Sequence, residues 1–247
     1  MTARVALVTG VVGGIGSAIA RNLSDNGARV VVTDLPGTAL DEAAATLDLP
    51  CIAANLGVQT DVASMIDEMT QTHGAPAILV NAAGGVCGQV GGPLDRVSVP
   101  DWRAIFAANV DSAFFLAQAT APAMADAGWG RIMTISSGAG LRPSLTGIQA
   151  YTAAKHALIG LTKQLSQEFG PSGVTVNCVA PGFVRSNPAT ERQWQSYGPD
   201  QQAALLNRIH TRRLGTAEDI AAAVGFLCSE PAGWISGQVL SVDGGIS

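Results

Sequence analysis

The chain has 247 residues, a formal net charge of −5, 13% charged residues and 47% hydrophobic residues. Disorder requires low hydrophobicity with high charge, and collagen requires a glycine at every third position, so this composition excludes both classes. The acidic balance and the scattered Lys and Arg residues argue against a nucleic-acid-binding face. A chain of this length can bury a sizeable core as one α/β domain or as two smaller domains.

No apolar run approaches the roughly 18 residues that a membrane span needs. Four glycines interrupt the apolar region near the start of the chain, which therefore lacks the solid hydrophobic block of a signal peptide. The four cysteines form no C-x-x-C pair, and the three histidines form no zinc motif. We therefore expect a cytoplasmic protein without a disulfide framework, a metal site or a membrane partner.

Short runs rich in β-branched residues alternate with longer helical stretches along the whole chain. The predicted strands are Arg4–Val8, Ala28–Thr33, Cys51–Asn55, Ala77–Val80, Arg131–Ile135, Thr175–Val179 and Val239–Val242. The predicted helices include Ile15–Asn26, Val62–His73, Asp101–Ala127, Tyr151–Phe169 and Ala217–Cys228. This alternation predicts an α/β fold with a parallel sheet and helices on both faces. No repeat, linker or shift in composition divides the chain, so we expect a single domain over residues 1–247.

One long segment has little periodicity. Residues 185–213 are polar, contain Pro188 and Pro199, and carry the aromatic residues Trp194 and Tyr197. A long, poorly patterned segment in a compact domain is usually a functional lid or a disordered loop. We expect it to be a substrate lid.

A cluster of glycines joins the first predicted strand to the first predicted helix. The segment Thr9-Gly10-Val11-Val12-Gly13-Gly14-Ile15-Gly16 carries them. Glycines allow a tight turn and let a pyrophosphate and the helix approach the backbone closely. The helix start offers unpaired N–H groups and a positive dipole end to the anion. An ordinary strand–helix turn is the alternative interpretation.

An acidic residue follows this cluster at the end of the second predicted strand. Asp34 ends the second predicted strand, 24 residues after Gly10. A carboxylate at this place can accept hydrogen bonds from the ribose hydroxyls of an adenosine, and it would repel a 2′-phosphate. Neither Gly13 nor Leu35 supplies a cation to offset that repulsion. The pattern therefore predicts NAD(H) as the cofactor, rather than NADP(H).

Tyr151 and Lys155 are four residues apart in a predicted helix and so share one of its faces. A free phenol has a pKa of about 10, and a nearby cation lowers it. Tyr151 is thus a candidate acid/base for interconverting a carbonyl and an alcohol. Ser137 follows a predicted strand and could donate a hydrogen bond to the substrate oxygen. Asn109 is a polar residue in an apolar part of a predicted helix, where it is either functional or a satisfied core amide.

These motifs, in this order, resemble the short-chain dehydrogenase/reductase family over essentially the whole chain. The resemblance is carried by Thr9-Gly10-x-x-x-Gly14-Ile15-Gly16, Asn81-Ala82-Ala83-Gly84, Asn109, Ser137, Tyr151-x-x-x-Lys155, Pro181-Gly182 and Val242-Asp243-Gly244-Gly245. It implies a seven-stranded Rossmann fold and a homotetramer. By the same resemblance Tyr151 moves the proton, Lys155 lowers the pKa of Tyr151 and bonds the nicotinamide ribose, and Ser137 orients the substrate carbonyl. Asn109 would hold a water that links Lys155 to a proton path.

The glycine cluster and the resemblance together predict a set of cofactor-binding residues. The set is Gly10, Gly13, Gly14, Ile15, Gly16, Asp34, Leu35, Asn55, Leu56, Asn81, Ala82, Ala83, Gly84, Tyr151, Lys155, Pro181, Gly182, Val184 and Ser186.

Three positions depart from the family pattern. Ser137 is 14 residues before Tyr151 where the family usually has 13, which leaves Ser136 as an alternative catalytic serine. The family's adenine-side Asp-Val pair is replaced by Asn55-Leu56, because Asp61-Val62 looks like the start of the next helix. Ser186 stands where threonine is common.

The predicted substrate walls are apolar and include Val86, Leu145, Ile148, Phe183 and Trp194. We therefore expect a mostly apolar ketone or secondary alcohol, although Arg142 or Arg185 could contact an anionic substrate. A 3-oxoacyl-thioester reductase is the alternative within the enzyme class, and a non-catalytic dinucleotide-binding regulator is the alternative outside it.

Overall fold

Six parallel strands form one sheet in the order β2-β1-β3-β4-β5-β6. The computed structural model describes residues 4–144 and 146–246. The strands are β1 (Val5–Thr9), β2 (Arg29–Thr33), β3 (Ile78–Asn81), β4 (Gly130–Ile135), β5 (Val174–Pro181) and β6 (Val239–Val242). The order reverses direction at β1, so a crevice between β1 and β3 at the carboxyl ends is the expected ligand site of such a sheet.

The predicted strand Cys51–Asn55 is the one difference in the sheet. Within the described chain it forms an isolated parallel bridge between Val32 and Cys51 instead of a continuous ladder. The N–H of Ile52 donates to Val32 O at 3.0 Å, but the next bond, from Ala54, goes to Asp34 O beyond the end of β2. The segment therefore runs along the sheet edge without being a seventh strand, and the prediction of seven strands is corrected to six.

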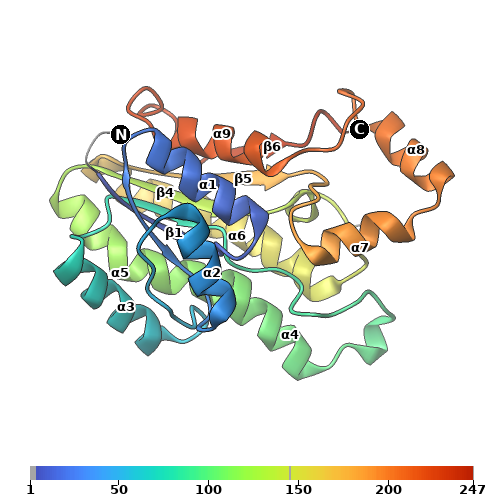
Figure 1. Cartoon of the computed structure of the whole chain (residues 1–247), viewed down its shortest axis with the longest axis horizontal. Coiled ribbons are helices and arrows are strands. Elements are labelled where there is room, and N and C mark those ends of the chain that lie inside the picture. Colours follow the sequence, from blue (N-terminus) through green and yellow to red (C-terminus); the bar gives the residue numbers. More distant parts are fainter. Residues whose placement is uncertain (1–3, 145, 247) are drawn as a thin grey trace.

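Helices cover both faces of the sheet (Figure 1). One face carries α1 (Gly14–Asp25), α2 (Thr38–Leu47) and α9 (Ala217–Leu227); the other carries α3 (Gln59–Thr72), α5 (Ser112–Asp126) and α6 (Gln149–Phe169). Alternate residues of each strand point to opposite faces, so β1 buries Val8 under α1 and Leu7 under α3 and α5. This confirms the predicted α/β architecture.

A π-helical turn interrupts the predicted helix Asp101–Ala127. The segment is α4 (Val99–Phe106), a π-helix over Ala107–Asp111, and then α5. The Nδ2 atom of Asn109 donates to Ile105 O at 2.7 Å, which takes the carbonyl that the backbone of a regular α-helix would use. Side-chain capture of an i−4 carbonyl is a physical reason for the local widening.

The predicted lid contains two helices that the sequence patterns did not indicate. They are α7 (Pro188–Ser196) and α8 (Pro199–Arg208). Asn187 caps α7 by accepting hydrogen bonds from the N–H groups of Ala189 and Thr190 at 2.9 and 3.0 Å. Each proline stands at the first helical position, where its missing N–H costs nothing, so these prolines start helices rather than break them.

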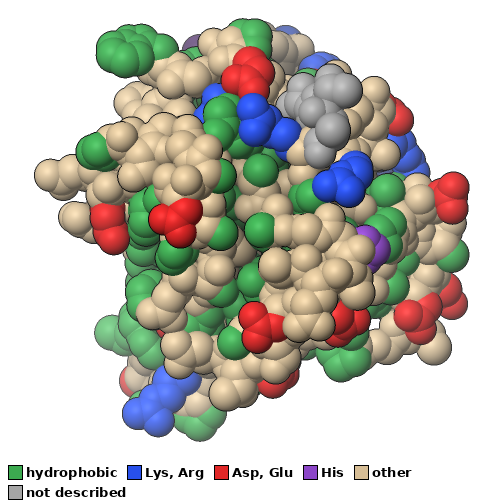
Figure 2. Space-filling model, turned by 90° about the vertical axis from the view of Figure 1, so that its left-hand side faces the viewer, with side chains coloured by type: hydrophobic (Ala, Val, Ile, Leu, Met, Phe, Trp, Pro, Cys, Tyr) green, Lys and Arg blue, Asp and Glu red, His purple; other side chains and the backbone are tan. Residues whose placement is uncertain are grey.

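The two ends of the sheet differ in what they carry. The chain begins at the amino ends of the strands, and α7, α8 and the C-terminal end lie at the opposite side (Figure 1). Figure 2 shows the side of the molecule on which the chain begins, where acidic, basic and hydrophobic side chains are interspersed. The predicted functional residues follow the strands, and they therefore gather at the carboxyl ends.

Candidate active site

The glycine loop after β1 is built by close backbone contacts. Gly10 has a φ of +71°, and a Cβ on it would lie 2.7 Å from Ala83 N. A Cβ on Gly16 would collide with Gly10 O, and one on Gly14 would lie 2.6 Å from Ser186 O. Gly13 differs, because the nearest atom to its Cβ position is Gly10 O at an ordinary 3.4 Å. Three of the four predicted glycines are thus required by packing.

The start of α1 keeps free donors for an anion. The N–H of Gly14 donates to Ser186 O at 2.8 Å, and that of Ser17 donates to Gly13 O at 3.0 Å. Within the described residues the N–H groups of Ile15 and Gly16 have no acceptor. They stand in the first turn of the helix, where backbone donors and the helix dipole favour a phosphate.

Asp34 lies beside this loop, as the spacing predicts. Its Oδ2 accepts from the N–H of Val12 at 3.0 Å, and its Oδ1 accepts from the N–H of Leu35 at 2.8 Å. A carboxylate oxygen has more than one acceptor site, so both oxygens can still receive ribose hydroxyls. Leu35 is exposed beside it.

Thr9, which opens the glycine motif but is not in the predicted cofactor-binding set, joins two predicted cofactor segments. Its hydroxyl donates to Asn81 Oδ1 at 2.9 Å and accepts from Ala83 N–H at 2.9 Å. The Nδ2 of Asn81 is buried and has no partner within the described chain. An unsatisfied buried donor is costly, so its place at the carboxyl end of β3 fits a site that a polar ligand completes. The threonine directly before Gly10 was the signal for it.

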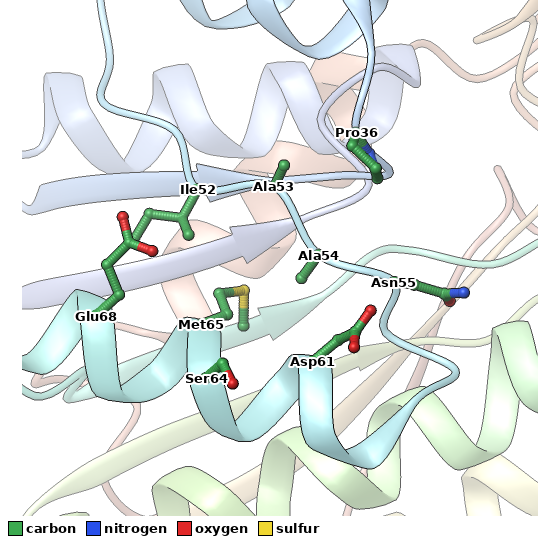
Figure 3. Close-up of a pocket in the computed structure, with 9 residues that line it drawn as sticks. All are labelled: Pro36, Ile52, Ala53, Ala54, Asn55, Asp61, Ser64, Met65 and Glu68. Carbon is green, nitrogen blue, oxygen red and sulfur yellow. The ribbon is translucent and has the colours of Figure 1, made fainter.

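A pocket of about 260 Å³ lies between the Ile52–Asn55 segment and α3 (Figure 3). Asn55 and Asp61 both line it, and the Asp61 carboxylate points toward the segment that carries Ala54 and Asn55. The sequence around Asp61 predicts the start of a helix, and Asp61 does lie in the first turn of α3. The turn between them nevertheless brings it to the same pocket. Leu56 is buried in the core below.

Ser137, Tyr151 and Lys155 meet at the end of β4. The Ser137 hydroxyl lies close enough to the Tyr151 hydroxyl to lower the pKa of that phenol. The Lys155 ammonium lies 5.5 Å from the centre of the Tyr151 ring and donates to Ile135 O at 2.9 Å. Ser136, the alternative serine, instead donates its hydroxyl to Lys155 O at 2.9 Å in a buried position. The geometry therefore favours Ser137 as the serine that faces the reacting groups.

Burial dominates the ionisation of both titratable groups. Desolvation raises the pKa of Tyr151, and the nearby Ser137 hydroxyl opposes that shift. Desolvation also lowers the pKa of Lys155 to about 8, so the ammonium form still prevails at neutral pH. Lys155 is not among the groups that shift the pKa of Tyr151, so the predicted lowering of that pKa by Lys155 stays a prediction.

Asn109 is fully buried and binds backbone groups with its side chain. Its Nδ2 donates to Gly85 O at 2.9 Å and to Ile105 O, while its Oδ1 accepts from Gly85 N–H at 3.0 Å. Both amide hydrogens are therefore in use. A Cβ on Gly84 would collide with this Oδ1, which explains the glycine there. The Asn109 amide fixes the loop after β3. Because both of its hydrogens are used, the water that Asn109 is expected to hold would have to donate to Oδ1 or to a backbone carbonyl.

The segment after β5 closes the other side of the site. The N–H of Gly182 donates to Val242 O at 3.0 Å, and a Cβ on Gly182 would lie 2.8 Å from the Cα of Asp243. Val184 is buried and pairs with Gly215. Ser186 O contacts the glycine loop, so Pro181–Ser186 and the start of α1 are neighbours.

The predicted substrate residues fall into two groups. Val86 and Ile148 pack with the Tyr151 ring in one apolar cluster. Phe183 and Trp194 form an aromatic cluster with Tyr197, with ring centres 6.1 to 6.4 Å apart. Leu145 lies outside the described residues.

Neither a metal-binding cluster nor a membrane-spanning helix is found in the part of the chain that the structure describes. Over residues 4–144 and 146–246, no group of three or more His, Cys, Asp or Glu residues could hold a metal ion. In the same residues no helix is both long enough and apolar enough to cross a membrane.

Comparison with known proteins matches nearly the whole chain. A family model described as enoyl-(acyl carrier protein) reductase matches residues 10–247. The 3-oxoacyl-(acyl-carrier-protein) reductase FabG of Escherichia coli (strain K12) is 38% identical over 251 residues, which cover 98% of this chain and 97% of the relative. The chain belongs to the short-chain dehydrogenase/reductase family.

Other members of the family agree in fold and reaction type. Dehydrogenase/reductase SDR family member 4 of Homo sapiens is 34% identical, over 98% of this chain and 87% of the relative. A solved structure described as a candidate gluconate dehydrogenase from Agrobacterium tumefaciens has a TM-score of 0.91 and 25% sequence identity, and the match covers 99% of this chain and 96% of that one. These findings confirm the Rossmann-type fold, and the protein is an oxidoreductase.

Proposed function

We propose that this protein is an NAD(H)-dependent dehydrogenase that interconverts a secondary alcohol and a ketone. The observation that carries the proposal is the meeting of Ser137, Tyr151 and Lys155 at the carboxyl end of the sheet, where the glycine loop also lies. A phenol that lies beside a serine hydroxyl and near an ammonium is suited to giving and taking one proton.

Nicotinamide, when bound, supplies the acceptor or donor of the hydride. The first turn of α1 would hold the pyrophosphate, Asp34 the adenosine ribose, and Asn55 with Asp61 the adenine edge. Asn81 offers its buried, unpaired Nδ2 to the bound group. Lys155 has three N–H donors and uses one of them on Ile135 O, so two remain for ribose hydroxyls.

The protein's own residues move the proton. Ser137 donates a hydrogen bond to the substrate oxygen and orients it toward Tyr151. In alcohol oxidation Tyr151 must be a phenolate to take the hydroxyl proton, and in ketone reduction it must be a phenol to give one. Because burial raises the pKa of Tyr151, oxidation is expected to speed up as the pH rises and reduction to slow down.

Asp34 supports the choice of NAD(H). A carboxylate that already accepts two backbone N–H groups is held beside the glycine loop, and it would repel a 2′-phosphate. The ratio of kcat/KM for the two dinucleotides tests this part. A preference for NADPH would contradict it and would favour the 3-oxoacyl-thioester reductase that the name of the Escherichia coli relative suggests.

The experiment that tests the proposal is an absorbance screen for NADH formation. The protein is mixed with NAD+ and with a panel of secondary alcohols, each supplied as both enantiomers. NADH formation with at least one alcohol is the expected result. Tight NADH binding without turnover of any alcohol or ketone would contradict the proposal and favour a dinucleotide-binding regulator.

Location and assembly are part of the same proposal. All four cysteines are free thiols, which favours a reducing, cytoplasmic compartment. Large apolar side chains lie exposed on several elements, including Phe114, Phe226, Trp234 and Leu240. In a homotetramer, which the family resemblance implies, such residues would be buried between copies of the chain.

A further inference from the structure

Arg142 lies beside Gly138, the residue that follows Ser137. Its backbone N–H donates to Gly138 O at 3.1 Å and so closes the short turn that begins at Ser137. Its Nη2 lies 3.5 Å from the position that a Cβ on Gly138 would occupy, and Pro181 O lies 3.7 Å from the same position. Because Gly138 directly follows Ser137, a guanidinium lies at the carboxyl ends of β4 and β5, where the substrate oxygen is expected.

The donors of this guanidinium are hardly used. Its nearest carboxylate, Asp243, is 3.8 Å away, whereas a charge-assisted hydrogen bond is about 2.7–2.9 Å long. The Oδ1 of Asp243 accepts from Gly245 N–H at 2.9 Å, so that carboxylate is partly committed to its own turn. Among the described residues the Arg142 side chain donates no hydrogen bond, and it is 40% exposed.

Arg185, the other arginine considered as a partner for an anionic substrate, is already paired. Its Nε and Nη2 donate to the two oxygens of Glu191 at 2.7 and 2.8 Å. That bidentate geometry is the one a guanidinium prefers with a carboxylate, and it is complete within the chain. Arg142 is therefore the guanidinium at this site that has room for a second carboxylate.

We propose that Arg142 is a specificity-determining residue that binds a carboxylate of the substrate, so that the enzyme acts on hydroxy acids and the matching oxo acids. The inference rests on the proposed function and names its substrate class. The apolar cluster of Val86, Ile148 and the Tyr151 ring would contact the carbon chain, and Arg142 would bind the charged end.

The reaction leaves the carboxylate unchanged. The C–H bond at the carbinol carbon breaks, and its electron pair leaves with the hydrogen as hydride to NAD+. The hydroxyl proton passes to the Tyr151 phenolate and then to water, and the carbon–oxygen double bond forms. The products are an oxo acid, NADH and one proton.

Asp243 provides a second variant that tests the proposal. A carboxylate 3.8 Å from the guanidinium competes with a bound acid for it. The Asp243→Asn variant keeps an oxygen to accept from Gly245 N–H but loses the charge. It is expected to bind the acid several-fold more tightly than the wild type does.

The test compares an acid with its neutral amide. Straight-chain carboxylates of four to eight carbons and the matching primary amides lack the reacting hydroxyl, so they act as dead-end ligands. Their dissociation constants are measured by calorimetry on the enzyme saturated with NADH. The wild type is expected to bind the best acid about 10- to 100-fold more tightly than its amide. Arg142→Gln should bind both alike, and Arg142→Lys should keep part of the preference.

Arg103→Gln, which changes an exposed arginine on α4, is the matched control and should keep the full preference. Equal binding of acid and amide by the wild type, no binding of either, or an acid preference that survives in Arg142→Gln would each overturn the inference. The turnover of neutral secondary alcohols with NAD+, measured on the same samples, separates this outcome from failure of the proposed function. If neutral alcohols react and acids gain nothing from Arg142, the dehydrogenase stands and the carboxylate site does not.

Discussion

Lys155 is a charged side chain in a buried place. It is 4% exposed, and its ammonium has one described hydrogen-bond acceptor, Ile135 O. Such burial of a cation destabilises the folded protein. The lowered pKa of Lys155 reflects the free energy lost when the ammonium is removed from water. The protein keeps this residue because the site needs a positive charge near Tyr151, which is the usual reason for strained ionisation at a reacting centre.

This cost predicts a pH dependence of stability. The pKa of Lys155 falls from 10.5 in the unfolded chain to about 8 in the folded one. Between these values the unfolded chain binds more protons, so the contribution of Lys155 to the free energy of unfolding rises as the pH rises and is flat outside that window. The total rise is about 3 kcal/mol.

The difference in unfolding free energy between wild type and Lys155→Met isolates this effect. Denaturant unfolding is measured from pH 7 to 11. The unfolding free energy of the wild type should rise relative to that of the variant between pH 8 and 10.5. Lys163→Met, an exposed lysine on the same helix, should show no such gain. A constant difference across the range would mean that Lys155 is not held at a lowered pKa.

At this scale the sequence predicted most of the site. The spacing of Tyr151 and Lys155, the serine after a strand and the acid after Gly10 each correspond to a contact in the structure. The sequence analysis gave Thr9 no role of its own and set Asp61 aside, because a threonine inside a strand and an acid inside a helix have ordinary structural explanations. What Thr9 contributes depends on Asn81, which is distant in sequence, and what Asp61 contributes depends on the turn that brings it to the same pocket as Asn55.

Among the elements, the glycine loop restricts most clearly which residues its positions can hold. Gly16 packs its Cα against Gly10 O, whereas Gly13 has room for a methyl group. Gly16→Ala should therefore open the loop and weaken NADH binding at least about 10-fold, since a Cβ there displaces backbone rather than a flexible side chain. Gly13→Ala should stay within about 3-fold of the wild type.

Fluorescence titration with NADH measures both variants, and circular dichroism checks that each is folded. Equal losses in the two variants would show that the loop depends on backbone freedom at every glycine. Equal tolerance would show that the contact between Gly10 and Gly16 does not hold the loop.

Element types were more predictable than their interruptions. The apolar periodicity gave α1, α3, α6 and α9 within a few residues of their observed ends. The π-helix escaped because it depends on one side-chain bond, from Asn109 to Ile105 O, that a periodic pattern does not report. The lid helices escaped because they are short and polar, and Asn187 with its following proline was the local signal for α7.

Over the whole molecule, stability and chemistry occupy opposite ends of the sheet. At the amino ends, the guanidinium groups of Arg4 and Arg131 lie 3.5 and 4.2 Å from the centre of the Trp129 ring. Glu230 accepts hydrogen bonds from Trp129 Nε1 and from Arg4. This cluster connects the starts of β1 and β4 with the chain after α9, far from the carboxyl ends that carry the site.

Trp129→Leu should lower the free energy of unfolding by about 1–3 kcal/mol, because it removes both cation–π contacts and the indole bond. NADH affinity should not change. Trp129→Phe keeps an aromatic ring and should lose less. Denaturant unfolding and NADH titration of both variants measure this, and a loss of NADH affinity without loss of stability would contradict the separation of the two ends.

The sequence could not predict which distant residues become neighbours. Arg142 and Asp243 are about one hundred positions apart, and no local pattern relates them. Their approach follows from the parallel sheet, which brings the ends of β4, β5 and β6 to one edge. The fold class was predictable from alternation, but the charge distribution at that edge required the tertiary structure.

The proposed function depends on the Tyr151 hydroxyl, which moves the proton in the hydride-transfer reaction. The most direct test is the Tyr151→Phe variant, which removes one oxygen from a buried ring and should leave the cofactor cradle intact. In this variant we expect kcat with a secondary alcohol found in the NAD+ screen to fall at least about 100-fold, while the dissociation constant for NADH stays within about 2-fold. Turnover equal to that of the wild type would contradict it.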